Sequence, residues 1–403
     1  MTNPEPPEVP VTLSAFAAEV VEALRAAGVT ENVSYDEVLA ELVVGDRRMP
    51  LAPVHRELAT ASADRRLDAA RQLAEVFLRP PTLPATWDEA SRVVLPSLAT
   101  RFATVRADAR ASAQRNVVPT PRAEFTSHAV MELCVASGAA RATVPLASLT
   151  AWGISPDVAF QTALRNLAAR SEAQWLGSPE APGVYRSPWR DGFDAARIAL
   201  PRQFARVPLR GRAVVLAPSP SQLLLAGSDD VDGLFHLARF ARRHLEANRT
   251  IFMLRALCMG EDGESWEDWE PPRDHAAYDA FRFLRAAQEV HEATEQAALV
   301  REMIPPGRDV LEMPPLEMVQ SPLAETRTVT TWAMGRPAAL PRADLIVFRR
   351  GKETLGFATW EQVERALPDV LSPLPGYPTR YRVTDFPEGW QLDGLGLEPW
   401  GGA

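Results

Sequence analysis

The segment from Arg190 to Arg197 carries the residues whose types and spacing come nearest to chemistry. Its sequence is Arg-Asp-Gly-Phe-Asp-Ala-Ala-Arg, so Asp191 and Asp194 stand three positions apart and Arg197 follows them. Two carboxylates beside a guanidinium can hold a cation or position a polar substrate for acid–base work. The same residues are also typical of a turn at Asp191-Gly192, a helix cap at Asp194 and an ion pair from Arg197 one helical turn on. The sequence leaves both interpretations open.

An acidic stretch with two tryptophans is the second candidate for a functional site. Glu264, Glu267 and Asp268 flank Trp266 and Trp269. Large aromatic side chains often anchor protein interfaces, so this stretch, expected to be a loop, would dock a basic partner. The alternative is an acidic loop whose tryptophans fold back onto the body of the protein, where each buries a large apolar area.

The chain holds no motif of the large catalytic families. The patterns GxxxxGK[ST], GxSxG and HExxH are missing, as is a GxGxxG that follows a strand. The closest pair of histidines, His236 and His244, is eight positions apart on a predicted helix. That spacing is a rise of about 12 Å, whereas metal ligands lie about 2 Å from their ion. We therefore expect no cofactor and no metal site.

Charge and composition indicate which cellular compartment and which classes of partner to expect. Fifty-two acidic residues against 43 basic ones give a net charge of −9, which is unlike a dedicated nucleic-acid protein. No stretch approaches the ~18 apolar residues of a membrane span, and the acidic, proline-rich N-terminus does not resemble a signal peptide. Cys134 and Cys258 belong to no motif and are typical of free thiols in a reducing compartment. We expect a cytoplasmic protein whose partner is another protein, with no nucleic acid and no membrane.

Three local patterns predict the elements that must position these residues. Two apolar runs, Arg212–Ala217 and Gln222–Gly227, predict a hairpin at the centre of a sheet, because both of its faces are apolar. Ser155 with the proline and aspartate that follow it predicts a helix start. A helix of about 27 residues is expected after the acidic loop, and at a rise of 1.5 Å per residue it would be about 40 Å long. Its main apolar seam is expected at Ala276, Ala280, Phe283, Ala287, Val290, Thr294 and Ala297, with a second row at Ala277, Phe281 and Leu284.

These patterns predict an α+β fold: two successive small αβ units, a long helical segment and a small C-terminal αβ module. The expected divisions are a disordered N-terminus at 1–10, an αββα unit at 11–83, a central αβ domain at 84–250, the acidic loop with the long helix and a proline-rich linker at 251–320, and the C-terminal module at 321–403.

Several short motifs resemble a known bacterial family. They are Pro50–Glu57, Val93–Pro96, Trp152–Ser155, Asp191–Arg197, and the strand pair Val214–Ala217 and Leu223–Ala226. Together they resemble the YtpQ-like family of unknown function over about half of the chain, from Val38 to Leu245. The chain departs from the family by its acidic and helical insertion and its C-terminal module after Leu245. The resemblance implies an α+β fold and a cytoplasmic bacterial protein, and it brings no activity and no site residues.

The leading hypothesis is a non-catalytic interaction or adaptor protein, because catalytic motifs are missing and the acidic stretch offers two aromatic anchors. An enzyme acting on a small polar substrate through Asp191, Asp194 and Arg197 is the alternative. A defence- or toxin-associated accessory protein is a second alternative. A deep pocket at the Asp191–Arg197 segment would favour the enzyme, and a flat face bearing Trp266 or Trp269 would favour the adaptor.

Overall fold

A computed structural model describes residues 11–30, 33–36, 41–44, 47–51, 54–55, 58, 61–78, 82–113, 117–137, 140–189, 191–248, 251–304, 311–320 and 325–400. The expected disordered N-terminus at 1–10 lies outside these residues, as do Arg190 and parts of the expected linker at 305–310.

The fold is α+β, as predicted, and the chain forms two compact units. The first unit comprises Met1–Ser97, Glu132–Arg170 and Arg243–Thr250, and the second comprises Leu98–Met131, Ser171–Arg242 and Ile251–Ala403. The expected domain boundaries stay predictions.

In the first unit, two helices pack on a small antiparallel sheet. The helices are α1 (Leu13–Ala26) and α3 (Ala63–Leu78), and the strands, in the order β1-β2-β3, are Val33–Asp36, Glu41–Val44 and Arg47–Pro50. The hydroxyl of Thr12 caps α1 by accepting a hydrogen bond from the amide of Ala15. Phe16, Val20 and Leu24 recur at helical spacing and are fully buried. The predicted unit therefore contains one strand more than the expected αββα pattern.

A second core of the first unit forms around α7 (Pro156–Ala169). The Ser155 hydroxyl caps this helix, with proline in its first turn, as the sequence predicts. The side-chain amide of Asn166 donates to the carbonyls of Ser91 and Val94, at 2.8 and 2.9 Å. The neighbouring elements are α4 (Trp87–Ala90), α6 (Leu146–Ala151) and β7 (Ala140–Thr143), which pairs with β6 (Ala129–Ser137).

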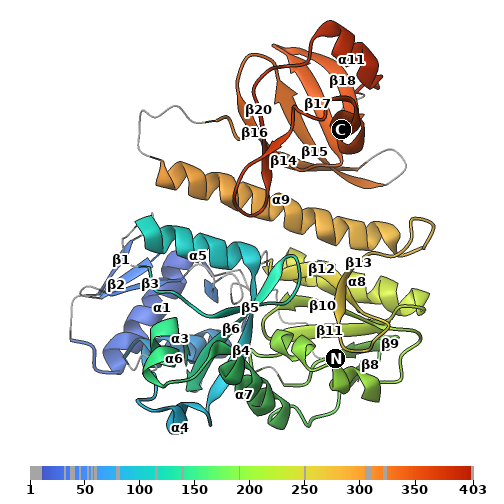
Figure 1. Ribbon diagram of the computed structural model, residues 1–403. Helices are drawn as coiled ribbons and strands as arrows, with labels where there is room; N and C mark the ends of the chain where they lie inside the picture. The colour runs from blue at the N-terminus through green and yellow to red at the C-terminus, as the bar shows by residue number, and fades with distance from the viewer. Residues whose placement is uncertain are drawn as a thin grey trace, which may run out of the picture. The chain divides into compact units, whose positions relative to one another are not determined.

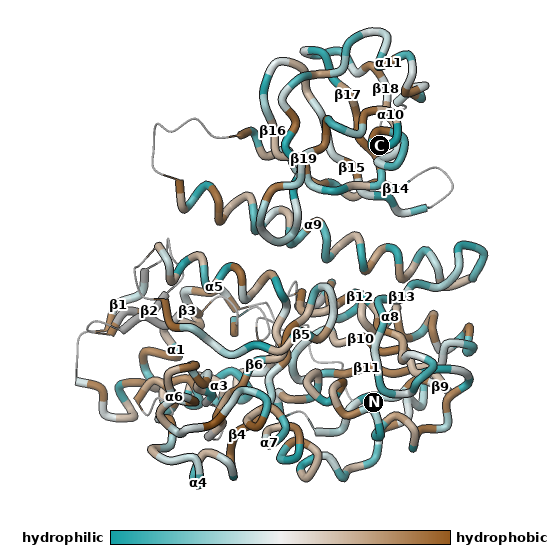
Figure 2. Tube along the Cα trace, in the orientation of Figure 1, coloured by the Kyte–Doolittle hydropathy of each residue, from teal (hydrophilic) through white to brown (hydrophobic). Residues whose placement is uncertain are grey.

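The second unit is built on a six-stranded sheet in the order β13-β12-β10-β11-β9-β8 (Figure 1). The strands are β8 (Leu176–Ser178), β9 (Ala181–Arg186), β10 (Ala213–Ser219), β11 (Gln222–Gly227), β12 (Met253–Met259) and β13 (Trp266–Trp269). The predicted hairpin, β10 with β11, is central in this sheet. Figure 2 shows its hydrophobic trace, and the two strands are almost entirely buried. Cys258 on β12, like Cys134 in the first unit, is a buried free thiol.

The expected long helix is α9 (Tyr278–Met303), with 26 residues. The second apolar row, Ala277, Phe281 and Leu284, is buried, whereas Ala276 and Thr294 of the expected main seam are exposed. Of the other seam residues, Ala297 is buried and Ala280, Phe283, Ala287 and Val290 are half-buried, so the second row is the more deeply buried of the two. The helix contacts β12, β14 and β15 of its own unit.

The C-terminal part of the second unit contains two sheets and two short helices. One sheet has the order β14-β15-β17-β18 and the other β16-β20-β19. The elements are β14 (Leu316–Gln320), β15 (Thr326–Ala333), β16 (Ala338–Pro341), β17 (Leu345–Arg350), β18 (Glu353–Thr359), α10 (Trp360–Ala366), β19 (Ser372–Pro373), β20 (Arg380–Val383) and α11 (Gly389–Leu395). Because β14 pairs with β15, residues 316–320 form a strand where the sequence predicted a linker.

The remaining strands and α-helices described are β4 (Val94–Thr100), α5 (Arg101–Ala113), β5 (Arg122–Glu124) and α8 (Val231–Asn248). Within the described ranges, no helix combines the length and the apolar character needed to cross a membrane.

Candidate functional site

Arg197 is a fully buried guanidinium that is held on three sides. Its Nη1 and Nη2 donate to the two carboxylate oxygens of Asp191, each at 2.8 Å, and its Nε donates to the Ser171 hydroxyl at 2.8 Å. Its carbon Cζ lies 4.2 Å from the ring centre of Trp189. A bidentate arginine–carboxylate pair with a stacked ring fixes both position and orientation. Arg197, Asp191, Ser171 and Trp189 therefore form a rigid cluster, which we call the rigid joint.

The predicted pairing within this segment was wrong in one respect. The ion pair of Arg197 is with Asp191, six positions away, and not with Asp194. The segment Ala195–Ala199 is a 3-10 helix, η1, and the side chain of Asp194 makes no cap hydrogen bond there. Gly192, with a φ of 76°, turns the chain so that Asp191 faces back, and the carboxylate of Asp191 accepts from the amide of Phe193 at 2.9 Å.

These bonds determine the direction in which the pKa of Asp191 is shifted. Partial burial raises its pKa, but the hydrogen bonds from Arg197 and Phe193 and the charge of Arg197 outweigh burial, so its pKa is lowered. Asp194 and Arg197 are fully buried. Neither side chain touches the surface, so their contribution to any site is to hold its walls.

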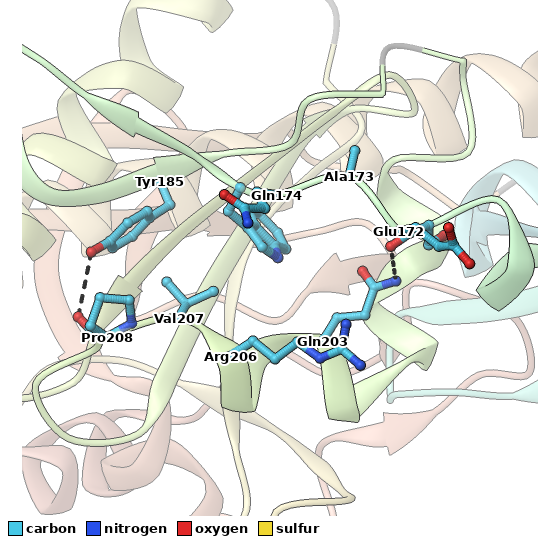
Figure 3. Close-up of a pocket in the computed structure, with 10 residues that line it drawn as sticks. Glu172, Ala173, Gln174, Tyr185, Gln203, Arg206, Val207 and Pro208 are labelled. Carbon is cyan, nitrogen blue, oxygen red and sulfur yellow. Dashed lines mark hydrogen bonds between the residues drawn. The ribbon is translucent and has the colours of Figure 1, made fainter.

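A pocket of about 360 Å³ opens beside this joint (Figure 3). Its lining residues are Ser171, Glu172, Ala173, Gln174, Trp175, Tyr185, Gln203, Arg206, Val207 and Pro208. Ser171 connects the pocket to the rigid joint. Its hydroxyl accepts a hydrogen bond from Arg197, and its carbonyl accepts one from the side-chain amide of Gln203 at 3.0 Å. The volume falls in the range of ordinary small-molecule sites, about 300–1,000 Å³.

The pocket has an apolar end and a polar end. Figure 3 shows Tyr185, Val207 and Pro208 at one end and Glu172 and Gln203 at the other. The Tyr185 hydroxyl donates to the carbonyl of Pro208 at 3.4 Å, which leaves the ring face as the surface of the apolar end.

Arg206 belongs to the polar end. It closes the 3-10 helix η2 (Pro201–Arg206), and residues three apart in such a helix lie on the same side, so Arg206 follows Gln203. Arg206 and Glu172 are both exposed, and neither forms an ion pair with any residue in the described ranges. The pocket therefore carries one cation and one anion that the fold does not use.

Aromatic side chains back the pocket and connect the two candidates from the sequence. Ring centres of Trp189 and Trp175 are 5.8 Å apart, those of Trp175 and Phe204 5.5 Å, and those of Phe204 and Trp266 5.0 Å. The indole nitrogen of Trp266 also donates to the carbonyl of Ile198 at 2.9 Å. Trp266 thus packs against η1 and η2 as a half-buried side chain.

The expected acidic loop is a β-hairpin, since β13 pairs with β12 along its length. Trp269 stacks edge-on against Phe281 of α9, with ring centres 5.5 Å apart. Glu267 lies 4.0 Å from Arg212, and Glu264 is exposed in the turn. Both tryptophans fold back onto the body, which was the alternative to the docking surface.

Asp268 has a different environment from its acidic neighbours. One carboxylate oxygen lies 3.1 Å from Nδ1 of His128, and the other accepts from the Ser127 hydroxyl at 2.6 Å. Partial burial raises the pKa of Asp268, but its bonds to His128 and Ser127 and the charge of His128 lower it to about 2. In a serine-hydrolase triad the serine bonds Nε2 and the aspartate bonds Nδ1. Here Ser127 lies on the Nδ1 side, 3.3 Å away, so the trio is no such triad.

Asp268 forms the exposed edge of a group of polar side chains, which we name the His128 cluster: His128, Asp268, Gln288 and Glu292. Gln288 accepts from the amides of Leu254 and Arg255 at 2.8 and 3.1 Å and donates to Glu292 at 2.9 Å. His128, Gln288 and Glu292 are buried.

Burial shifts the titration of this cluster. Burial raises the pKa of Glu292, against the opposing effects of its bond from Gln288 and the charge of Arg255. Burial and the charge of Glu292 raise the pKa of Tyr377. The adjoining cavity of about 50 Å³ has room for one or two waters. Among the residues that the structure describes, no three potential ligands are grouped so that they could hold a metal ion.

A larger groove of about 520 Å³ lies between α1 and α3 in the first unit. Alanine, leucine and four charged residues, Glu19, Glu22, Arg71 and Glu75, line it. The lining comes from α1, its cap residue Ala27 and α3. We base the functional argument on the pocket beside Arg197.

Comparison of the chain with family models, with curated proteins and with solved structures found no match. The resemblance to the YtpQ-like family accordingly stays a prediction.

The sequence argument missed the residues that carry the pocket's polar end: Glu172, Gln203 and Arg206. None belongs to a motif. One signal was available, since Pro201 begins a short helix in which residues three apart share a side. The segment Asp191–Arg197, which the sequence indicated as a candidate site, does not line the pocket, and Arg197 contacts it only through Ser171.

Proposed function

We propose that the protein binds a small amphipathic molecule in the pocket beside Arg197. The observation that carries the proposal is the pocket's polarity: an apolar end at Tyr185 and Val207, and an opposite end where Glu172 and Arg206 have no ion-pair partner among the described residues. Charged side chains gathered in a concave site without partners are a common sign of a ligand site.

The rigid joint supports this proposal. Arg197 fixes the Ser171 hydroxyl, and Gln203 fixes the Ser171 carbonyl, so the segment from 171 to 175 and η2 are held at a set separation. A site held by buried, hydrogen-bonded groups binds with little loss of conformational entropy. The alternative from the sequence, a small polar substrate at Asp191, Asp194 and Arg197, is thus kept in altered form. The ligand would lie next to these residues and not on them.

The proposal is tested by filling the apolar end. Val207→Trp should remove a small molecule that co-purifies with the wild-type protein, as detected by native mass spectrometry. Val231→Trp is the matched control, because Val231 is 45% exposed and does not line the pocket. Equal retention of the small molecule by both variants would place its site elsewhere.

The interaction hypothesis for the acidic hairpin stays a second proposal, carried by the exposed Glu264. Its test must spare Asp268, which is bonded to His128 and Ser127. Glu264→Lys should abolish binding of a protein partner in a cross-linking assay and leave the melting temperature unchanged. If binding persists, the hairpin turn is not the interface.

A further inference from the structure

The unpaired charges at the polar end indicate which small molecule the pocket takes, an inference that rests on the proposed function. We propose that the ligand is a free α-amino acid with an apolar side chain. Its carboxylate would bind Arg206, its ammonium group would bind Glu172, and its side chain would lie at the apolar end.

Arg206 supplies the carboxylate site. Its planar guanidinium presents paired N–H donors that match the two oxygens of a carboxylate. It is exposed, and no carboxylate in the described ranges pairs with it. The contrast with Arg197, whose donors are taken by Asp191 and Ser171, is direct.

Glu172 supplies the ammonium site. An ammonium group has three donors and no acceptor, so a carboxylate is its natural partner. Glu172 is exposed, follows the buried Ser171 directly and pairs with no cation that the structure describes. Its position is set through Ser171, which Arg197 and Gln203 both hold.

The two opposite charges select against simpler ligands. A phosphate or a plain carboxylate on Arg206 would meet the negative charge of Glu172, and a plain amine on Glu172 would meet the positive charge of Arg206. A molecule with both charges satisfies both groups. Because Glu172 and Arg206 both belong to the polar end of a pocket of about 360 Å³, the ligand that fits them carries its two charges near each other, as a free amino acid does and an extended peptide does not.

The apolar end selects the side chain. Tyr185, Val207 and Pro208 line it, and the Tyr185 hydroxyl is already bonded to the Pro208 carbonyl. A polar side chain placed there would lose its bonds to water with little return. An apolar side chain gains about 25 cal/mol for each Å² that it buries.

The test is isothermal titration of the full-length protein with three probes: L-phenylalanine, L-phenylalaninamide and N-acetyl-L-phenylalanine. The amide lacks the carboxylate, and the acetyl compound lacks the ammonium group. We expect L-phenylalanine to bind at least tenfold more tightly than either analogue, since a charge-assisted hydrogen bond contributes about that factor.

Variants assign the charges. Arg206→Gln should weaken L-phenylalanine at least tenfold and leave the amide unchanged, and Glu172→Gln should weaken L-phenylalanine and leave the acetyl compound unchanged. The matched controls are Arg202→Gln, on the same helix η2, and Glu180→Gln, since both side chains are exposed and neither lines the pocket. These controls should not change binding.

Three results would overturn the inference: no binding of L-phenylalanine at millimolar concentration, equal binding of all three probes, or equal losses in the pocket variants and their controls. If any of these occurs while Val207→Trp still displaces a co-purifying molecule, the ligand class is wrong and the proposed function stands. If Val207→Trp displaces nothing as well, both fail.

Discussion

The second unit contains two arginines on neighbouring 3-10 helices with opposite surroundings. Arg197 on η1 is fully buried and spends its donors on Asp191 and Ser171, whereas Arg206 on η2 is exposed and has no ion-pair partner among the described residues. A buried charge must be paired to be tolerated, but a charge at a pocket rim is hydrated and remains available. The comparison separates the residue that builds the site from the residue that would bind.

The acidic side chains divide in the same way. Glu292 is buried in the His128 cluster and Asp268 is hydrogen-bonded at its edge, and both have displaced pKa values, whereas Glu172 and Glu264 are exposed and form no ion pair with any described residue. Perturbed carboxylates frequently mark functional sites, yet structural networks perturb them as well. Here the cavity at the cluster has room for one or two waters, so we assign the perturbed carboxylates to structure and the exposed Glu172 to binding.

The largest effect is expected when the buried pair is broken. Arg197→Met should lower the free energy of unfolding by about 3 kcal/mol, because it removes a fully buried side chain together with its hydrogen bonds to Asp191 and to the buried Ser171 hydroxyl. Chemical denaturation measures the loss. The double variant Arg197→Met with Asp191→Asn should lose less free energy of unfolding than the sum of the two single losses, since both substitutions remove the same interaction. If the loss in the double variant equals the sum of the single losses, Arg197 and Asp191 do not stabilise the fold as a pair.

The next effect is expected at Glu292, which is buried. Since burial raises its pKa above the ordinary 4.5, the folded protein binds this proton more tightly than the unfolded chain does. Stability from this group is therefore greatest below about pH 4.5 and is lost as the pH rises through the raised value.

Thermal melts from pH 4 to pH 8 test this expectation. Glu292→Gln should flatten the decline relative to the wild type, with Glu264→Gln as the exposed control. Parallel curves for the wild type and Glu292→Gln would show that Glu292 does not titrate in this range.

A smaller effect of opposite sign is expected at Asp268. Its pKa is lowered to about 2, so its stabilisation is present above pH 4 and is lost as the pH falls toward 2. The side chain is 43% exposed, and solvent screening reduces the contribution to about 1 kcal/mol. Asp268→Asn should remove that part of the acid transition in a denaturation series between pH 4 and pH 2. An unchanged transition would contradict the bond to His128.

The smallest effect on stability is expected in the pocket. Glu172→Gln and Glu180→Gln should each change the free energy of unfolding by less than about 0.5 kcal/mol, because exposed unpaired charges contribute little. The measurement is chemical denaturation without added ligand. A loss above 1 kcal/mol for Glu172→Gln alone would mean that Glu172 has a structural partner.

Local chemistry made several elements predictable from the sequence. Ser155 caps α7, and Thr359 with Gln362 forms the capping box of α10, because these bonds depend on residues three apart. The central hairpin was predictable because both of its strands are apolar on both faces. The failures involve partners far away in sequence. Nothing near Asp268 indicates His128, 140 positions earlier, and nothing near Ser171 indicates Arg197.

The candidate site was therefore predictable only in its neighbourhood. Asp191, Asp194 and Arg197 drew attention because two carboxylates stand beside an arginine, but the ion pair of Arg197 is with Asp191 and not with the predicted Asp194. Burial decides whether a charge is structural or available, and burial depends on tertiary packing that the local pattern does not contain.

The central claim is that Arg206 binds the ligand whereas Arg197 only stabilises the wall of the pocket. One paired measurement tests this claim. Ligand retention by native mass spectrometry and the free energy of unfolding are measured on the same preparations of wild type, Arg206→Gln and Arg202→Gln. We predict that Arg206→Gln loses the co-purifying molecule at unchanged stability, while Arg202→Gln keeps both. If Arg206→Gln retains the molecule, or loses it only together with stability, the division between the two arginines is wrong.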